Sequence, residues 1–560
     1  MNRAVAQLFR RIATLLELQG ESAYKTRAYR RAADAIETLE EPIEALWQAG
    51  RLTEIPGVGA AIAGKIDEYL RTGQLGFLER LEAEVPPTLL EILSLPGLGV
   101  KKVRRLWQEL GITDIDMLEE AARYGRLRAL PGFGARTETR ILEAIQARRD
   151  QPTGVLLGEA YPRAQQVLKR LRGIPAIARA ELAGSTRRGK ALVGDLDLLL
   201  AAEQPAEALQ AALEHLGLQG EVVLHPDYAE TETRLPEGFP LHLIATRPER
   251  WGSAWVLSTG SAEHVQALGG SAALPNDAPT EAAFYQALGL PWIPPELREG
   301  RGEVAAARRG ALPTLLTAAD IRADLHNHSD WSDGHATIRQ MAEAALARGL
   351  QVLAITDHSQ SLGVAHGLTP EHLRAQREEI HRVQAELGDR ILLLQGAEVE
   401  ILADGRLDYP DEVLAELDVV VASLHTSLRQ PREQITARLL RAIRNPHVDI
   451  IGHPSGRLLP HRPGADLDWE AVLTAAAQHG VALEINAHPR RLDLADHLVQ
   501  QATGRGILIS INTDAHRPTD FDNLFYGVLT ARRGWASPEN IINTWETDRL
   551  LAWLRHRPAA

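Results

Sequence analysis

Two histidines and an aspartate lie within eight residues of one another in the C-terminal half of the chain. They are His326, His328 and Asp333, in the stretch Ala323-Asp-Leu-His-Asn-His-Ser-Asp-Trp-Ser-Asp-Gly334. Side chains alternate faces along a strand, so both imidazoles of a His-x-His pair at a strand end point to one side. Imidazole and carboxylate groups are ligands of zinc, manganese and iron. The stretch therefore predicts a metal site, although a polar loop with solvated histidines is the alternative for so short a motif.

More side chains of the same types follow in this half of the chain. Fifteen of the 20 histidines lie between residues 321 and 520. Packing alone hardly explains so many ligand-type groups at strand ends, which favours the metal-site interpretation. The additional candidates, each at or near the end of an apolar run, are His358, Glu398, His425, His453, Asp514 and His516.

Alternating strands and helices must position these candidates. Near-continuous apolar strands separated by helical patterns indicate a parallel barrel. In such barrels the functional residues gather at the carboxyl ends of the strands, where the candidates lie. The predicted strands are 323–329, 353–358, 391–398, 419–425, 449–453, 482–487 and 507–516, and the predicted helices include 336–348, 370–387, 431–444 and 468–479.

The order of the motifs resembles the PHP (polymerase and histidinol phosphatase) domain. The motifs are His-x-His, Ser-Asp-Gly, Thr-Asp-His, Gly-x-Glu, Leu-His, Gly-His-Pro and Thr-Asp-x-His, within residues 320–557. The resemblance implies a distorted seven-stranded barrel with a cluster of three divalent ions, for which we expect Mn²⁺ or Zn²⁺. Carried over by motif, the ligands are the nine candidates named above.

Length and composition limit the remaining possibilities. A chain of 560 residues is too long for one core and indicates about three or four domains. It has no cysteine, which excludes disulfides and thiolate sites and fits a reducing cytoplasm. No apolar run approaches the roughly 18 residues of a membrane span, so we expect no membrane association. The net charge is −13, which argues against non-specific binding to nucleic acid.

Residues 1–150 are electrically balanced, with 22 Lys and Arg against 22 Asp and Glu. We expect a helical DNA-binding or lyase-like domain over 1–85 and a helix-hairpin-helix region over 86–150. Apolar-Pro-Gly-apolar-Gly occurs three times, each time before a predicted helix whose free N–H groups can bind phosphate. One such turn is more often a plain connection between helices, but three favour contact with the DNA backbone. The candidate residues are Gly57, Gly59, Gly97, Gly99, Lys101, Lys102, Gly132 and Gly134. The turns resemble helix-hairpin-helix motifs, which often bind a monovalent cation.

A second potential phosphate and metal site lies between these two regions. Ala183-Gly-Ser-Thr-Arg-Arg-Gly-Lys190 precedes Gly194-Asp-Leu-Asp-Leu-Leu-Leu200. Asp-x-Asp on a strand places both carboxylates on one face, where they can hold Mg²⁺. The combination resembles the palm of nucleotidyltransferases. By that resemblance Gly184, Ser185 and Arg188 bind nucleotide phosphates, and Asp195 and Asp197 bind Mg²⁺ or Mn²⁺.

The whole arrangement resembles a bacterial family X DNA polymerase with a C-terminal PHP domain, a multidomain α+β and α/β chain. We expect the palm at 151–235 and the palm end and thumb at 236–312. The chain departs from the family where a third catalytic aspartate belongs, because His242 stands there and binds Mg²⁺ poorly. The family's Tyr-Phe-Thr-Gly-Ser is Leu257-Ser-Thr-Gly-Ser261, and two nucleotide-contacting residues become Val265 and Gly269.

The function expected from these motifs is DNA repair, including base excision repair. The PHP domain would be a Mn²⁺-dependent 3′-to-5′ exonuclease acting on gapped, nicked or 3′-end DNA. Addition of deoxynucleoside triphosphates would be weak. By resemblance, Lys65 is the candidate Schiff-base lysine. A small-molecule phosphomonoesterase and a non-catalytic DNA-end scaffold are the alternatives, and we expect a monomer.

Overall fold

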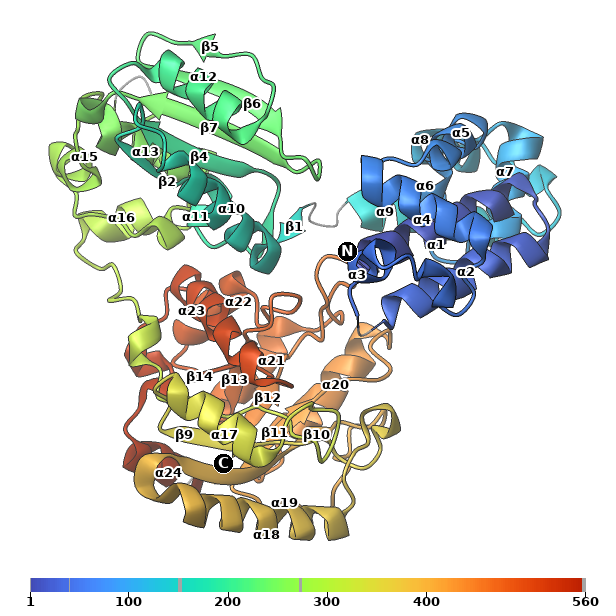
Figure 1. The fold of residues 1–560 in the computed structure, drawn as a ribbon. Helices are drawn as coiled ribbons and strands as arrows, with labels where there is room; N and C mark the ends of the chain where they lie inside the picture. Colours follow the sequence, from blue (N-terminus) through green and yellow to red (C-terminus); the bar gives the residue numbers. More distant parts are fainter. Residues whose placement is uncertain (1, 40, 150–153, 271–273, 556–560) are drawn as a thin grey trace. The chain divides into compact units, whose positions relative to one another are not determined.

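The computed structural model describes residues 2–39, 41–149, 154–270 and 274–555. The chain forms two compact units, residues 1–151 and 152–560 (Figure 1). In the described part of the chain, no helix combines the length and the apolar character that a bilayer crossing requires.

The first unit is entirely helical where it is described. An apolar core that includes Phe9, Tyr29 and Val103 joins its helices. Side-chain caps start two of them, because Ser22 accepts a hydrogen bond from the amide of Lys25 and Asp114 accepts one from the amide of Met117. The helices are α1 (Asn2–Gln19), α2 (Ala23–Glu37), α3 (Ile43–Gln48), α4 (Ala60–Thr72), α5 (Gly76–Glu84), α6 (Leu89–Leu93), α7 (Val100–Leu110), α8 (Ile115–Arg123) and α9 (Ala135–Arg149).

The three repeated turns precede helices, as the sequence predicts. Gly57, Gly97 and Gly132 have φ angles of 83°, 81° and 91°, a left-handed conformation that favours glycine. Helices α4, α7 and α9 begin three residues after these glycines. Each repeat is therefore a tight turn that leads into exposed backbone N–H groups at a helix start.

The second unit begins with a five-stranded mixed sheet in the order β2-β4-β7-β6-β5. The β4 and β7 strands are parallel, and their register places Asp197 beside His242. Helices α10 and α12 pack on this sheet. The elements are β1 (Val155–Leu156), α10 (Leu157–Leu171), β2 (Arg179–Leu182), α11 (Gly184–Arg187), β3 (Leu192–Val193), β4 (Leu196–Ala201), α12 (Pro205–Leu216), β5 (Val223–Leu224), β6 (Tyr228–Arg234) and β7 (Pro240–Thr246).

A small helical region follows the sheet and has its own apolar core around Phe284 and Tyr285. Arg187 from the sheet region reaches into it and binds Glu281 through two hydrogen bonds of 2.7 and 2.9 Å. Arg298 binds the same carboxylate at 2.6 Å. The helices are α13 (Trp251–Thr259), α14 (Ala262–Leu268), α15 (Glu281–Ala287) and α16 (Glu303–Arg308).

The remainder of the second unit is a parallel seven-stranded barrel in the order β14-β13-β12-β11-β10-β9-β8 (Figure 1). Backbone hydrogen bonds from His328 to Ala515 (2.9 Å) and from Asp514 to His326 (3.0 Å) connect its two end strands beyond their regular parts. The predicted fold class is confirmed. The strands are β8 (Ala323–Asp324), β9 (Val352–Ile355), β10 (Leu392–Glu400), β11 (Val419–Ser423), β12 (Ile450–Gly452), β13 (Ala482–Asn486) and β14 (Ile509–Asn512).

Helices lie outside the barrel strands, and the four helices predicted from the sequence match α17, α18, α20 and α21 within two residues at each end. Helix and strand residues share one apolar cluster that includes Met341, Ile380 and Leu439. A second cluster contains the strand residues Val421 and Ile450. The barrel helices are α17 (Ile338–Ala347), α18 (Pro370–Leu387), α19 (Asp411–Leu414), α20 (Arg432–Ile443), α21 (Trp469–His479), α22 (Asp496–Thr503), α23 (Leu524–Arg533) and α24 (Thr547–Arg555).

Buried ion pairs join the barrel to the preceding region within the second unit. Arg533 at the end of α23 binds Glu299 at 2.7 Å and Asp496 at 2.8 Å. Its Nη1 also donates to the backbone carbonyl of Arg188 at 2.9 Å. Arg301 reaches the same Asp496 carboxylate at 3.0 Å. These contacts couple the two parts because each isolated partner would leave a buried charge unpaired.

Candidate metal centre and palm site

The nine predicted metal ligands lie at the carboxyl ends of the barrel strands. His326 and His328 follow β8, Glu398 lies near the end of β10, and Asp514 follows β14. Eight of the nine form three groups in which the potential ligand atoms lie within 4.8 Å of one another. The groups are His328, Asp333, His358 and His516; His326, His328, Glu398 and Asp514; and His358, Glu398 and His425. His453 joins them through Glu398, at 2.8 Å from its Oε1.

Glu398 stands at the centre of this cluster. Its Oε1 lies 3.1 Å from His425 Nε2, and its Oε2 lies 2.9 Å from His358 Nδ1 and 3.3 Å from His326 Nε2. The two nitrogens that face Oε2 are buried but make no hydrogen bond with suitable geometry. Buried nitrogens that approach a carboxylate without donating to it suit ligands arranged around a cation. The residues present therefore fit divalent metal ions.

The electrostatics of the cluster favour a cation. Burial alone would lower the pKa of His358, but Glu398 and Asp333 raise it to about 10. Burial is likewise outweighed at His516, where Asp333 and Asp514 raise the pKa to about 9. His328 behaves differently, because burial and the neighbouring His516 and His358 lower its pKa to about 3. Carboxylates that attract protons to these rings would attract a metal ion to the same lone pairs.

Two buried carboxylates that were not predicted from the sequence orient the ligand imidazoles. Glu484 on β13 lies 2.8 Å from His326 Nδ1, and Glu400 on β10 lies 2.7 Å from His425 Nδ1. Such contacts fix the ring orientation and the tautomer of a metal-bound histidine. The sequence feature that could have indicated them is an acidic residue inside an apolar strand run, as in Ala482-Leu-Glu-Ile-Asn486.

In the five-stranded sheet, His242 lies between two carboxylates. Its Nδ1 is 3.0 Å from Asp197 Oδ1, and its Nε2 is 3.1 Å from Glu230 Oε2. The hydrogen bond to Asp197 contributes most to a raised pKa of His242, against the opposing effect of burial. Asp195 lies two residues before Asp197 and faces a cavity that His242 also lines. The imidazole thus contacts the Asp197 carboxylate that a metal ion would need.

The loop before this strand is tightly packed around Gly184. A Cβ at Gly184 would lie 1.7 Å from Asp197 Oδ2, and its φ is 53°, so only glycine fits there. Ser185 Oγ is buried without a hydrogen bond to any described residue. Arg188 binds Glu299 at 2.7 Å and the carbonyl of Thr259 at 2.7 Å. Its guanidinium is thus engaged by protein groups.

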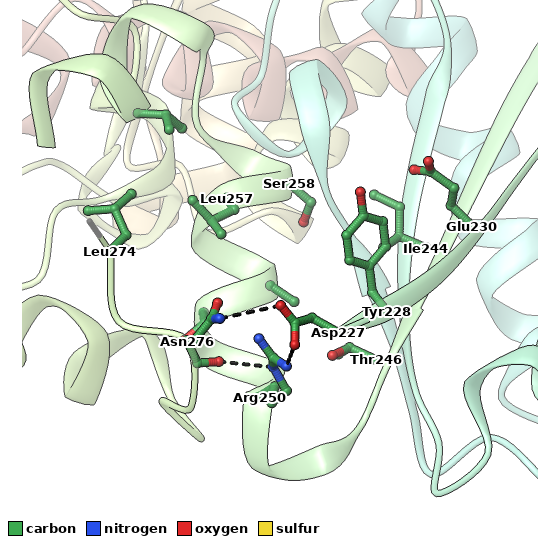
Figure 2. A pocket seen from close by; sticks show the side chains of 13 residues that line it. Asp227, Tyr228, Glu230, Ile244, Thr246, Arg250, Leu257, Ser258, Leu274 and Asn276 are labelled. Atoms are coloured by element: carbon green, nitrogen blue, oxygen red, sulfur yellow. Dashed lines mark hydrogen bonds and ion pairs between the residues drawn. The ribbon is translucent and has the colours of Figure 1, made fainter. Parts of the chain in front are cut away.

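A cavity of about 640 Å³ opens between β6, β7 and α13 (Figure 2). Leu257, Ser258 and Val265, where the chain departs from the family X motif, contribute to its lining. Arg250 is the one cation among the described lining residues, and it forms an ion pair with Asp227. The described lining of the cavity therefore offers no free positive charge for a triphosphate.

Comparison with known proteins agrees with this architecture. Family models match for a helix-hairpin-helix domain over residues 1–75, a SAM-like helix-hairpin-helix tandem over 89–147 and a PHP domain over 324–488. The chain is 37% identical to "DNA polymerase/3'-5' exonuclease PolX" of Bacillus subtilis (strain 168), over 98% of this chain and 99% of that protein. The chain belongs to the family X DNA polymerases with a PHP domain. It is also 32% identical to a "Probable phosphatase" of Thermoanaerobacter sp. (strain X514), over 42% of this chain and 94% of that protein.

In this family X chain, the predicted DNA-binding glycines lie in the three turns and at the helix starts. Lys101 and Lys102 lie in the first turn of α7, where Lys102 donates to the carbonyl of Gly97 at 3.0 Å. Lys65 lies on α4, 4.8 Å above the ring of Phe77, and donates to the carbonyl of Ala61 at 3.2 Å. Among the described residues, no hydrogen bond connects Lys65 with the second turn or with Lys101 and Lys102.

Proposed function

We propose that this protein is a DNA-repair nuclease that removes nucleotides from DNA 3′ ends by hydrolysis in the PHP barrel. The observation that carries the proposal is the convergence of nine buried or half-buried ligand side chains on one rim, in a chain that also has three helix-hairpin-helix turns. The name of the B. subtilis relative includes this activity. The phosphatase relative, in contrast, covers only 42% of this chain, which favours DNA over a small phosphomonoester.

Divalent ions at such a site polarise a phosphate and lower the pKa of an attacking water toward neutrality. The chain contributes Glu398 at the centre and imidazoles that Glu484 and Glu400 orient. We propose Mn²⁺ or Zn²⁺ at this site, because a histidine-rich set suits either ion better than Mg²⁺, which prefers oxygen ligands. Imidazoles bind metal only when neutral, so protons compete with the ions and activity should decrease as the pH falls.

The test incubates purified protein and Mn²⁺ with DNA and with a phosphorylated amino alcohol, and it separates three outcomes. Shortening of a 3′-recessed DNA whose 5′ end is labelled supports the exonuclease, and release of phosphate from a phosphorylated amino alcohol supports the phosphomonoesterase. Binding of DNA without either reaction supports the scaffold. Intact single-stranded and primed DNA after long incubation would overturn the nuclease proposal.

We further propose that nucleotide addition by the palm is weak. Two-metal catalysis needs carboxylates on both ions, and His242 binds Asp197 where the family has a third aspartate. Arg188, the expected phosphate ligand, is paired with Glu299. Extension of a gapped primer by a nuclease-disabled protein tests this proposal. Robust extension that Asp195→Ala abolishes would contradict it.

Lys65 supports a second candidate activity, cleavage of a 5′-deoxyribose phosphate through a Schiff base. Burial lowers the pKa of Lys65, and nearby Lys25 and Arg80 lower it further, against the effect of Glu68. A lowered pKa increases the fraction of neutral, nucleophilic amine. Borohydride should trap the protein on incised abasic DNA, and Lys65→Ala should abolish the adduct, whereas Lys101→Ala should not. An unchanged adduct in Lys65→Ala would exclude this lysine.

A further inference from the structure

Arg491 lies beside the metal centre, on the loop that follows β13. Its Nε is 3.6 Å from Asp514 Oδ2, and its side chain is 17% exposed. The other oxygen of Asp514 faces His328 Nε2 at 3.0 Å. Asp514 therefore stands between the imidazole cluster and the guanidinium, which places Arg491 one carboxylate away from the potential metal ligands.

One end of this guanidinium has no partner. Arg491 Nη1 is buried and makes no hydrogen bond to any of the residues that the structure describes. A buried charged donor without a partner is costly, so a site of this kind suits a ligand that supplies the acceptor. Water is one such acceptor, but a phosphate oxygen bears the charge that complements a guanidinium.

The backbone around Arg491 is fixed by several hydrogen bonds. Arg457 Nε donates to the carbonyl of Arg491 at 2.8 Å. The amides of Arg491 and Leu492 both donate to the carbonyl of His488, at 2.7 and 3.0 Å. A side chain on such a constrained loop has its direction set before a substrate arrives, which lowers the entropic cost of binding.

We propose that Arg491 binds a non-bridging oxygen of the scissile phosphate beside the metal centre. The inference deepens the proposed nuclease function and rests on it. The ligand class is a phosphate ester, and Arg491 takes no proton in the reaction because a guanidinium stays charged in proteins. Its role is to stabilise the negative charge that develops on the phosphate as water attacks.

A purely structural role for Arg491, as a counter-charge that orients Asp514, makes a different prediction. If Arg491 only orients Asp514, its loss should misplace this ligand and impair metal binding, and lysine should replace arginine well. Loss of a phosphate contact should leave metal binding intact, and lysine should replace arginine poorly, because an ammonium lacks the planar fork of donors.

The test uses the full-length protein and the variants Arg491→Ala and Arg491→Lys, with Arg490→Ala as the matched control on the adjacent exposed arginine. Bound Mn²⁺ is counted by mass spectrometry of the metal after dialysis, and binding of inorganic phosphate to the Mn²⁺-loaded protein is measured by calorimetry. Exonuclease kcat and KM are measured on a labelled single strand.

We expect Arg491→Ala to keep its Mn²⁺, bind phosphate at least about tenfold more weakly and lose about 100-fold or more in kcat/KM, as for other transition-state donors. Added guanidinium should restore part of the activity. Arg491→Lys should bind phosphate more weakly than the original protein while keeping its metal, and Arg490→Ala should change none of these values by more than about threefold.

Loss of metal in both Arg491 variants, or unchanged phosphate binding in Arg491→Ala, would overturn the inference. If Arg491→Ala does not fold, the bound Mn²⁺ and the phosphate affinity of Arg491→Lys test the inference by the same criteria. Should the original protein leave DNA intact but bind phosphate through Arg491, the nuclease proposal fails while the phosphate site stands.

Discussion

His242 shows how one side chain can change the chemistry of a strand pair. Its ring connects Asp197 and Glu230 across neighbouring strands, at the place where family X polymerases are expected to carry a third aspartate. The ring thereby satisfies these carboxylates without a metal ion. The palm site thus gains internal hydrogen bonds and lacks the third carboxylate that would help to attract Mg²⁺.

We expect His242→Asp to raise nucleotide addition in a protein whose nuclease is disabled by His328→Ala. The added carboxylate restores the ligand type that two-metal catalysis requires, and such groups contribute several kcal/mol, or about 100-fold or more in rate. Primer extension on gapped DNA measures the effect, with His242→Asn as the uncharged control. Equal extension by the aspartate and asparagine variants would show that the carboxylate is not what the palm lacks.

At the metal centre, we expect His328→Ala to abolish degradation of a labelled primer in Mn²⁺. His328 is fully buried and belongs to two of the three ligand groups, so its loss should weaken binding of more than one ion. His335→Ala is the control, because that histidine is exposed and belongs to none of the groups. Binding of DNA should persist in both variants, and retained nuclease activity in His328→Ala would contradict the assignment.

Among the elements, α15 is held by a buried ionic contact. Glu281 at its start binds Arg187 and Arg298, and the Arg187 guanidinium also lies 3.6 Å above the ring of Trp255. Burial alone would raise the pKa of Glu281, but the two arginines lower it to about 2 from an ordinary value of 4.5. The contact thus stabilises the fold only while this carboxylate is ionised.

We expect this contact to make stability depend on pH in the acidic range. A depressed folded-state pKa gives a contribution that is complete above about pH 4.5 and is lost as the pH falls toward 2. From the shift we expect about 2 kcal/mol to be lost between pH 7 and pH 3. Urea unfolding at several pH values measures it. Glu281→Gln should be less stable at pH 7 and less sensitive to acid, and an equal pH dependence in both proteins would refute the attribution.

The same scale shows what the sequence could and could not predict. Apolar runs that end in histidine or carboxylate predicted the barrel strands and the ligand rim, because strand ends of a parallel barrel share one edge. Glu484 and Glu400 were not predicted as orienting groups, since their role depends on which ring lies across the barrel. The contact between Glu230 and His242 could not be predicted because it depends on the register of β6 and β7. Arg491 could not be predicted because it lies on a loop, where no periodic pattern indicates which way a side chain points.

For the whole molecule, the buried ion pairs of Arg533 should make the sheet region and the barrel unfold together. We expect Arg533→Ala to destabilise the protein by about 1.5–3 kcal/mol, because the buried Glu299 and Asp496 would each lose one of two arginine partners. Arg505→Ala is the control, since Arg505 and Glu470 form an exposed pair worth about 1 kcal/mol or less. Differential scanning calorimetry should show one transition for residues 152–560 that Arg533→Ala lowers or splits. Equal effects of the two substitutions would contradict this view.

The division of the chain into two compact units affects how the barrel would bind the end of a DNA strand. When the hairpin turns engage a DNA backbone, the covalent link converts capture of a strand end by the barrel into an intramolecular event. Two binding modules joined in one chain can reach effective concentrations in the millimolar range. Removal of residues 1–151 should then raise KM for long DNA and flatten its dependence on salt, while hydrolysis of a dinucleotide stays unchanged. DNA binding by the first unit would thus raise the local concentration of the DNA end, so that the barrel itself needs only a weak affinity for DNA.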